Sequence, residues 1–181
     1  LETCLGREKN IFDETPDHAD RLVISSPILS PAKYQALKAI DIPAYRRKEI
    51  RHMYNPNEQN LEEALKGFCL KAEQAVRDGC VVLILSDKGA DPHWLPVHSL
   101  LVTGAIHHHL IKTGLRCESN IVVKTASARD PHQMATLIGY GATAIYPYLA
   151  YQVIEDMVEK ETVGSDMTQA FVNYRKGLEK G

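Results

Sequence analysis

The chain has 181 residues, which is enough for one domain of ordinary size, and 44% of them are hydrophobic while 24% are charged. These values are typical of a globular protein and exclude an intrinsically disordered one. Lys and Arg number 21 against 23 Asp and Glu, so the net charge is -2. A basic excess, which marks nucleic-acid or membrane-surface binding, is missing, and no apolar run approaches the roughly 20 residues of a membrane helix. We therefore predict neither a nucleic-acid nor a membrane partner.

Residues 1–60 are predicted to be an irregular, proline-containing segment. They hold five of the nine prolines, so regular elements should be short. Residues 21–24 predict a short strand, and Ser30 followed by Pro31 predicts a helix that runs to about residue 40. A basic cluster follows, which we interpret as a solvated loop face, with a docking surface for a neighbouring domain as the alternative. It consists of Arg46, Arg47, Lys48 and Arg51.

Residues 61–181 show repeated signals for strands and helices. Strands are predicted at 81–85, 120–125 and 142–146, and helices at 61–78, 96–113, 131–140, 148–160 and after a cap at Ser165. Alternation of this kind predicts right-handed crossovers and a parallel sheet. Three strongly patterned strands cannot close an eight-stranded barrel. We predict one α/β domain: a parallel-stranded open sheet, or a partial (degenerate) β/α barrel, with flanking helices.

The four cysteines match no zinc spacing and form no CxxC pair. Cys69 falls on the apolar stripe of a predicted helix and Cys80 at the start of a strand, so both are interpreted as buried free thiols. Free thiols favour a reducing, cytoplasmic compartment. Two disulfides remain the alternative.

Functional groups of α/β folds usually lie in loops at the carboxyl ends of the strands. Loops 86–89, 126–130 and 146–148 qualify, and their charges could form a structural ring of ion pairs, contact a neighbouring domain or hold a ligand. The candidate contacts are Asp87, Lys88, Arg129 and Asp130. The chain has no dinucleotide-binding glycine motif, P-loop or nucleophile elbow. We therefore predict no catalytic, cofactor-binding or metal-binding residue in it.

Three successive histidines, His107–His109, suggest a metal-dependent hydrolase as a further alternative. Neighbouring residues on a helix point about 100° apart, so three in a row do not converge on one ion. We interpret one of them as buried and hydrogen-bonded, with the others facing solvent or a neighbour.

Several stretches resemble the central domain of glutamate synthase large subunits, and they follow one another in order along nearly the whole chain. They are HADRLVISSPILS (18–30), VVLILSDKGAD (81–91), LLVTGAIHHHLIKTGLR (100–116), IVVKTASARDPHQMATLIGYGATAIYPYLAY (121–151) and NYRKGLEKG (173–181). The SARDPH and GATAIYPYLAY stretches are most similar to the bacterial form.

The resemblance implies a parent enzyme that makes two glutamates from glutamine and 2-oxoglutarate. In that family a glutaminase domain releases ammonia, and a β/α barrel with FMN and a 3Fe–4S cluster reduces the imine. The central domain links the two and helps wall the ammonia route, and the parent works with a small subunit or ferredoxin. None of the family's catalytic or cofactor residues maps onto this chain, so the fragment itself should be inactive.

The resemblance also implies that the chain begins partway into the central domain and stops just before the flavin domain. An isolated piece could expose apolar surface and self-associate. Two positions depart from the family pattern. Lys124 replaces a common Glu and should have a compensating partner, and Gln133 replaces a second His after His132. A stand-alone anion- or nucleotide-binding module, anchored by Lys88 and Arg129, is the alternative from another functional class.

Overall fold

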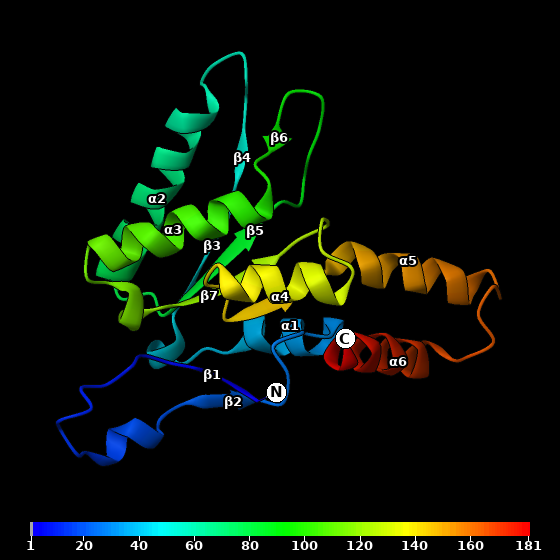
Figure 1. The fold of residues 1–181 in the computed structure, drawn as a ribbon, viewed down its shortest axis with the longest axis horizontal. Helices are drawn as coiled ribbons and strands as arrows, with labels where there is room; N and C mark the ends of the chain where they lie inside the picture. The colour runs from blue at the N-terminus through cyan, green and yellow to red at the C-terminus, as the bar shows by residue number, and fades with distance from the viewer. Residues whose placement is uncertain (1) are drawn as a thin grey trace.

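The computed structural model describes residues 2–181, and its centre is a four-stranded parallel sheet in the order β3-β5-β7-β8 (Figure 1). The strands are β3 (Arg47–Arg51), β5 (Val82–Ser86), β7 (Asn120–Lys124) and β8 (Ala144–Tyr146). Sheet order follows chain order, as in β/α barrels, whereas a doubly wound sheet reverses its order at a switch point. The predicted α/β class is confirmed, and the parallel sheet stays open within the described residues.

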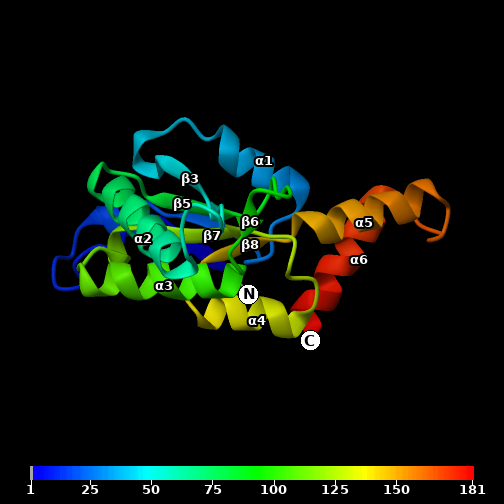
Figure 2. The ribbon, with the colours of Figure 1, turned by 90° about the horizontal axis from the view of Figure 1, so that it is seen from above.

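Helices cover both faces of this sheet (Figure 2). One face carries α2 (Leu61–Arg77), α3 (Ser99–Lys112) and α4 (Pro131–Gly139), and the opposite face carries α1 (Pro31–Ala39). Beyond β8, α5 (Tyr148–Glu159) projects from the body and α6 (Met167–Lys180) returns alongside it (Figure 1). Of the helices in residues 2–181, none has the length and apolar character needed to cross a membrane.

Short elements complete the fold around the sheet. Two antiparallel pairs form, β1 (Thr3–Leu5) with β2 (Leu22–Ile24) and β4 (Met53–Tyr54) with β6 (Leu95–Pro96). Three turns of 3-10 helix lie at η1 (Pro16–Ala19), η2 (Pro43–Tyr45) and η3 (Arg116–Glu118). The strand predicted near residues 21–24 is confirmed as β2.

The central strands are apolar on both faces because both faces are covered. All five residues of β5 are buried. Leu83 and Leu85 pack toward α2, α3 and α4, while Val82 and Ile84 pack toward α1. Alternate residues of a strand point to opposite faces, so a continuous apolar run supplies both layers of the core, as expected for a buried parallel strand.

Polar caps and glycines set the helix ends. The Asn60 side chain accepts a hydrogen bond from the Glu63 N–H, and the Glu63 carboxylate accepts one from the Asn60 N–H, which confirms the predicted capping box. The cap predicted at Ser165 is wrong by one position. Asp166 is the N-cap of α6, and its carboxylate accepts from the Gln169 N–H at 2.9 Å.

Two further predictions are corrected by the strand pairing. The basic cluster was interpreted as a loop, but residues 47–51 form β3, an edge strand of the main sheet. The helix predicted from residue 96 begins at Ser99, because residues 95–96 pair with β4. In both places a local sequence pattern gave way to pairing with a distant strand.

Candidate functional site at the carboxyl end of the sheet

Asp87 joins the loops that follow β5 and β7. Its side chain is only 7% exposed. The carboxylate accepts hydrogen bonds from the Thr125 hydroxyl at 2.6 Å, the Ala126 N–H at 2.9 Å and the Ser99 hydroxyl at 3.3 Å. Ser99 is the first residue of α3. One buried carboxylate therefore ties together two strand ends and the start of a helix, and these bonds offset the cost of burying its charge.

The other three candidate residues have separate local partners. Asp130 is the N-cap of α4 and accepts from the Gln133 N–H at 2.9 Å. Arg129 is exposed, while its backbone N–H donates to the Gln133 side chain at 2.8 Å and its carbonyl accepts from the Tyr174 hydroxyl. Lys88 is exposed, and its ammonium lies 5.6 Å from the centre of the Tyr148 ring. In residues 2–181 no ion pair joins these four residues, so the ring of ion pairs considered from the sequence is not formed.

The two departures from the family pattern now have a structural account. The Lys124 ammonium lies 3.3 Å from a Glu49 carboxylate oxygen, and the Lys124 side chain is only 12% exposed. The expected compensating partner is therefore present, on β3. The Gln133 side chain accepts a hydrogen bond from the Arg129 N–H, and the Gln133 N–H donates to the Asp130 carboxylate, so both bonds strengthen the start of α4.

Tyr148 completes the polar lining of this edge. Burial and the adjacent Asp87 carboxylate raise the pKa of Tyr148 to about 12. Its hydroxyl therefore stays protonated at neutral pH and does not act as a base.

His52 is a buried residue that the sequence reasoning missed. It directly follows β3 and has no exposed surface. Its Nδ1 lies 2.8 Å from the Val97 carbonyl oxygen, which can only accept, so Nδ1 carries the proton. Nε2 has no hydrogen-bond partner among residues 2–181. Burial lowers the pKa of His52, and this outweighs the opposing influence of the Asp87 charge.

We expect the free energy of unfolding to decrease as the pH is lowered, because of His52. Its folded pKa lies below the value of about 6.5 for an unfolded His, so stability is complete above that pH and is lost as the pH falls toward the folded pKa. The slope should approach about 1.4 kcal/mol per pH unit. Urea unfolding between pH 7.5 and 5 measures it. The variant His52→Asn, whose amide can still donate to Val97, should flatten the curve, whereas His108→Asn, at an exposed site, should not. Equal slopes for all three proteins would contradict the assignment.

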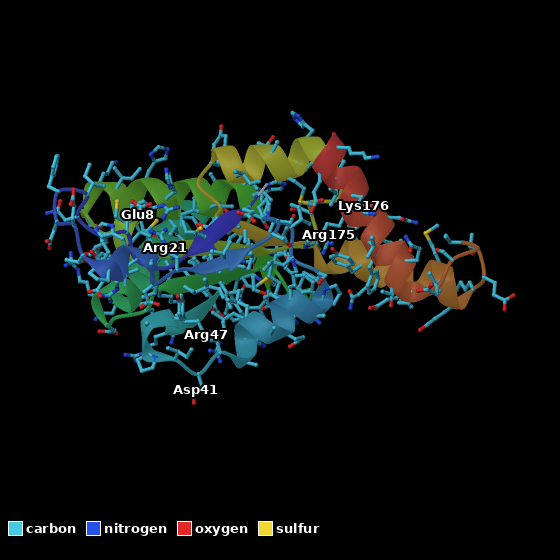
Figure 3. All side chains as sticks on the ribbon, turned by 90° about the horizontal axis from the view of Figure 1, so that it is seen from below. Glu8, Arg21, Asp41, Arg47, Arg175 and Lys176 are labelled. Carbon is cyan, nitrogen blue, oxygen red and sulfur yellow. The ribbon has the colours of Figure 1, made fainter. Side chains whose placement is uncertain are left out.

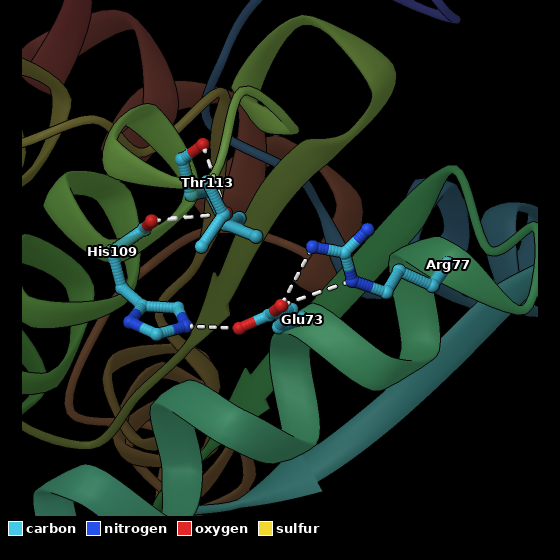
Figure 4. A network of polar contacts seen from close by, with 5 residues as sticks. Glu73, Arg77, His109 and Thr113 are labelled. Carbon is cyan, nitrogen blue, oxygen red and sulfur yellow. Dashed lines mark hydrogen bonds and ion pairs between the residues drawn. The ribbon is translucent and has the colours of Figure 1, made fainter.

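The three successive histidines point to different neighbours. His109 Nε2 lies 2.6 Å from a Glu73 carboxylate oxygen on α2, and Arg77 pairs with the other oxygen at 2.8 Å (Figure 4). Bonds from Arg77 and His109 lower the pKa of Glu73. His107 Nδ1 accepts from the Arg116 guanidinium at 2.9 Å, and His108 is exposed. The expectation of one buried histidine is wrong, because His107 and His109 are both partly exposed and both bonded.

The residues present do not fit the metal centres considered. In the described part of the chain, no three His, Cys, Asp or Glu side chains gather around a common point that could hold a metal ion. Cys69 and Cys80 are buried and free, as predicted, while Cys4 and Cys117 are exposed. Burial raises the pKa of the Cys69 thiol, which disfavours the thiolate that metals bind.

A small cavity of about 180 Å³ lies near the amino-terminal ends of α3 and α4. Its lining combines apolar and neutral polar side chains with two histidines, and it does not include Lys88 or Arg129. The lining residues are His98, Leu100, Ser127, Ala128, His132, Gln133, Thr136 and Leu137. The two cations proposed to anchor an anion therefore do not share this cavity.

Comparison with known proteins identifies the family. Residues 1–181 match the family model described as the glutamate synthase central domain. The chain is 35% identical, over 99% of its length, to the glutamate synthase (NADPH) large chain of Bacillus subtilis. It is 32% identical over its whole length to that of Azospirillum brasilense, and 38% identical over 84% of its length to the chloroplastic ferredoxin-dependent glutamate synthase of Oryza sativa subsp. japonica. These alignments span 12%, 12% and 10% of the respective relatives. The family expected from the sequence is thus confirmed, and the chain belongs to the glutamate synthase central domain family.

Proposed function

We propose that this chain is a non-catalytic scaffold within a glutamate synthase, the enzyme that converts glutamine and 2-oxoglutarate to two glutamates. It would link the glutaminase and FMN domains and help wall the route that ammonia takes between them. The main support for this proposal is that the Asp87 carboxylate is fully engaged in hydrogen bonds inside the fold. In a β/α fold a carboxylate at this edge is a candidate catalytic group, but here three internal donors occupy it. Such a carboxylate positions loops, and the exposed side chains of Lys88 and Arg129 are left for a neighbouring domain.

The chain spans about an eighth of the length of the bacterial relatives it matches. In this proposal the remaining length supplies FMN, the 3Fe–4S cluster and the catalytic residues. The relatives' names include NADPH, NADH and ferredoxin as electron donors. A small subunit and ferredoxin therefore both stay candidate partners of the parent enzyme.

Self-association and a cytoplasmic location are parts of the same proposal. Leu149, Val153 and Met157 are exposed along one stripe of the projecting helix α5, spaced four residues apart. Such a stripe suits contact with a neighbouring domain, or with a second copy when that domain is missing. Buried free thiols at Cys69 and Cys80 favour a reducing compartment.

The parent enzyme with Lys88→Ala and Arg129→Ala tests the scaffold role. Loss of interdomain contacts should loosen the ammonia route, so the ratio of glutamine hydrolysed to 2-oxoglutarate consumed should rise about twofold or more. The matched control is Lys112→Ala with Lys176→Ala, which removes two exposed cations elsewhere and should leave that ratio unchanged.

An unchanged ratio in the Lys88 and Arg129 variant would count against these residues as contacts. The scaffold role itself would fall if the purified 181-residue chain hydrolysed glutamine or retained a yellow flavin. The anion-binding alternative predicts heat in a calorimetric titration of this chain with phosphate or 2-oxoglutarate.

A further inference from the structure

The two edges of the central sheet differ in whether another segment of the chain forms hydrogen bonds with them. At the β8 edge, residues 27–29 run parallel to the strand. The Leu29 N–H donates to the Ile145 carbonyl at 2.8 Å, and the Ile145 N–H donates to the Pro27 carbonyl at 2.8 Å. The chain thereby closes this edge with its own backbone. At the opposite edge, β3 pairs with β5 and with no other strand among residues 2–181.

The backbone of β3 leaves hydrogen-bonding groups unpaired. The Arg46 carbonyl accepts from the Val82 N–H and the His52 N–H donates to the Ser86 carbonyl, so even-numbered positions point toward β5. In a parallel pair the alternate residues point both groups the other way. Arg47, Glu49 and Arg51 therefore direct their N–H and C=O groups outward, and these groups have no partner among residues 2–181.

A groove runs beside this edge, between β3 and α2. Its volume is about 750 Å³. Four cations and two carboxylates are among its lining residues, although the whole chain has a net charge of -2. Glu49 is already paired with Lys124. The cations are Arg46, Lys48, Arg51 and Lys71.

Neighbouring groups hold the strand in place without covering its edge. The Arg46 guanidinium donates to the Asp78 carbonyl at 2.8 Å. The Arg47 guanidinium donates to the Ile40 carbonyl, next to the turn that carries Asp41 (Figure 3). Lys48 and Arg51 are exposed and form no ion pair within residues 2–181. Their charges are available to a partner.

We propose that the open edge of β3 binds an extended, acidic polypeptide segment as an added strand. The outward backbone groups of Arg47, Glu49 and Arg51 would pair with the segment, and the cations would meet carboxylates on alternate residues of it. Backbone pairing supplies affinity for any extended chain, and the basic groove selects an acidic one. This inference does not depend on the proposed function, since it holds whichever reaction the parent catalyses.

The probe is a capped peptide of about ten residues that alternates Glu and Val, titrated into the 181-residue chain and followed by fluorescence anisotropy. We expect saturable binding that weakens with salt and slower amide hydrogen exchange at Arg47 and Glu49 in the complex. Lys48→Glu with Arg51→Glu should weaken binding about tenfold or more. The control, Lys9→Glu with Lys176→Glu, makes the same change in net charge at exposed sites elsewhere and should bind normally.

A second pair of variants separates backbone from charge. Arg51→Gln removes the charge but keeps the outward N–H, whereas Arg51→Pro removes both and leaves the bonds to β5 intact. Arg51→Pro should bind several-fold more weakly than Arg51→Gln. If the proline variant unfolds, a peptide methylated on alternate backbone nitrogens makes the same test on the unaltered chain.

Three results would overturn the proposal. The first is that a peptide of alternating Lys and Val binds as tightly as the Glu peptide. The second is that amide hydrogen exchange at Arg47 and Glu49 stays unchanged when the Glu peptide binds. Complete absence of binding would mean that the cations of β3 serve only to keep other strands away from this edge.

Discussion

Replacing Gly141 with alanine is expected to lower the free energy of unfolding by about 3 kcal/mol. Gly141 has a φ of +109°, a backbone conformation that side chains other than glycine rarely adopt. An added Cβ would lie 2.3 Å from His107 Nδ1 and 2.9 Å from His107 Cβ. The imidazole cannot simply swing aside, because Arg116 donates to its Nδ1 and also to the Gly141 carbonyl.

The matched control is Gly139→Ala, two positions earlier. Gly139 is the last residue of α4, it has no positive φ, and an added Cβ meets nothing within 4 Å. Alanine there should be neutral or should stabilise by up to about 1 kcal/mol. Urea unfolding of the two variants beside the parent chain makes the comparison. A loss below about 1 kcal/mol for Gly141→Ala would show that His107 and the backbone relax around the new methyl group.

The sequence predicts the centre of the sheet well because burial on both faces leaves a clear signal. Residues 81–85 form a continuous apolar run, and the structure buries every residue of β5. The same reasoning fails for β3, whose sequence Arg-Lys-Glu-Ile-Arg contains one apolar residue. An edge strand needs only partial burial, and charged residues on it discourage unwanted pairing. Its strand character comes from pairing with β5, and a local pattern does not record that pairing.

The sequence predicts which strand-end loops lie together, but it does not predict how they contact each other. Loops 86–89 and 126–130 are placed at one edge of the sheet, and the Ala126 N–H does donate to Asp87. Opposite charges suggested ion pairs, whereas the donors to Asp87 are two neutral hydroxyls and a backbone N–H. Ser99 and Thr125 lie 12 and 38 positions away in the chain, and their donor role depends on the positions of the helix and the loop.

For Lys124, the need for a counter-charge could be predicted from the sequence, but the residue that supplies it could not. A reversed charge at a mostly buried position requires a counter-charge, and that partner exists. Its identity as Glu49 could not be derived, because Glu49 belongs to the strand that was interpreted as a loop. The missed strand and the unidentified partner have the same cause.

Removing the Asp87 carboxylate should have the other large effect. Asp87→Ala would remove the acceptor of the Thr125 hydroxyl and of the Ala126 N–H in a buried site, while the Ser99 hydroxyl would keep the Thr125 hydroxyl 2.7 Å away as a partner. Loss of one partner in a buried charged network costs about 3–5 kcal/mol. We therefore expect the free energy of unfolding, measured with urea at neutral pH, to fall by that amount. Asp156→Ala, which breaks an exposed ion pair with Lys160, should change it by less than about 1 kcal/mol.

The variant Asp87→Asn distinguishes a structural role of the Asp87 carboxylate from a direct role in the reaction. Asparagine keeps the size of the side chain and one acceptor oxygen, but it places an NH₂ group where a second acceptor stood. It should recover part of the stability lost in Asp87→Ala. If Asp87 acts only by joining the loops after β5 and β7, coupling of ammonia transfer in the parent enzyme should fall in proportion to lost stability. If Asp87→Asn folded with full stability yet abolished turnover, the carboxylate would be acting on substrate, and the scaffold assignment would be wrong.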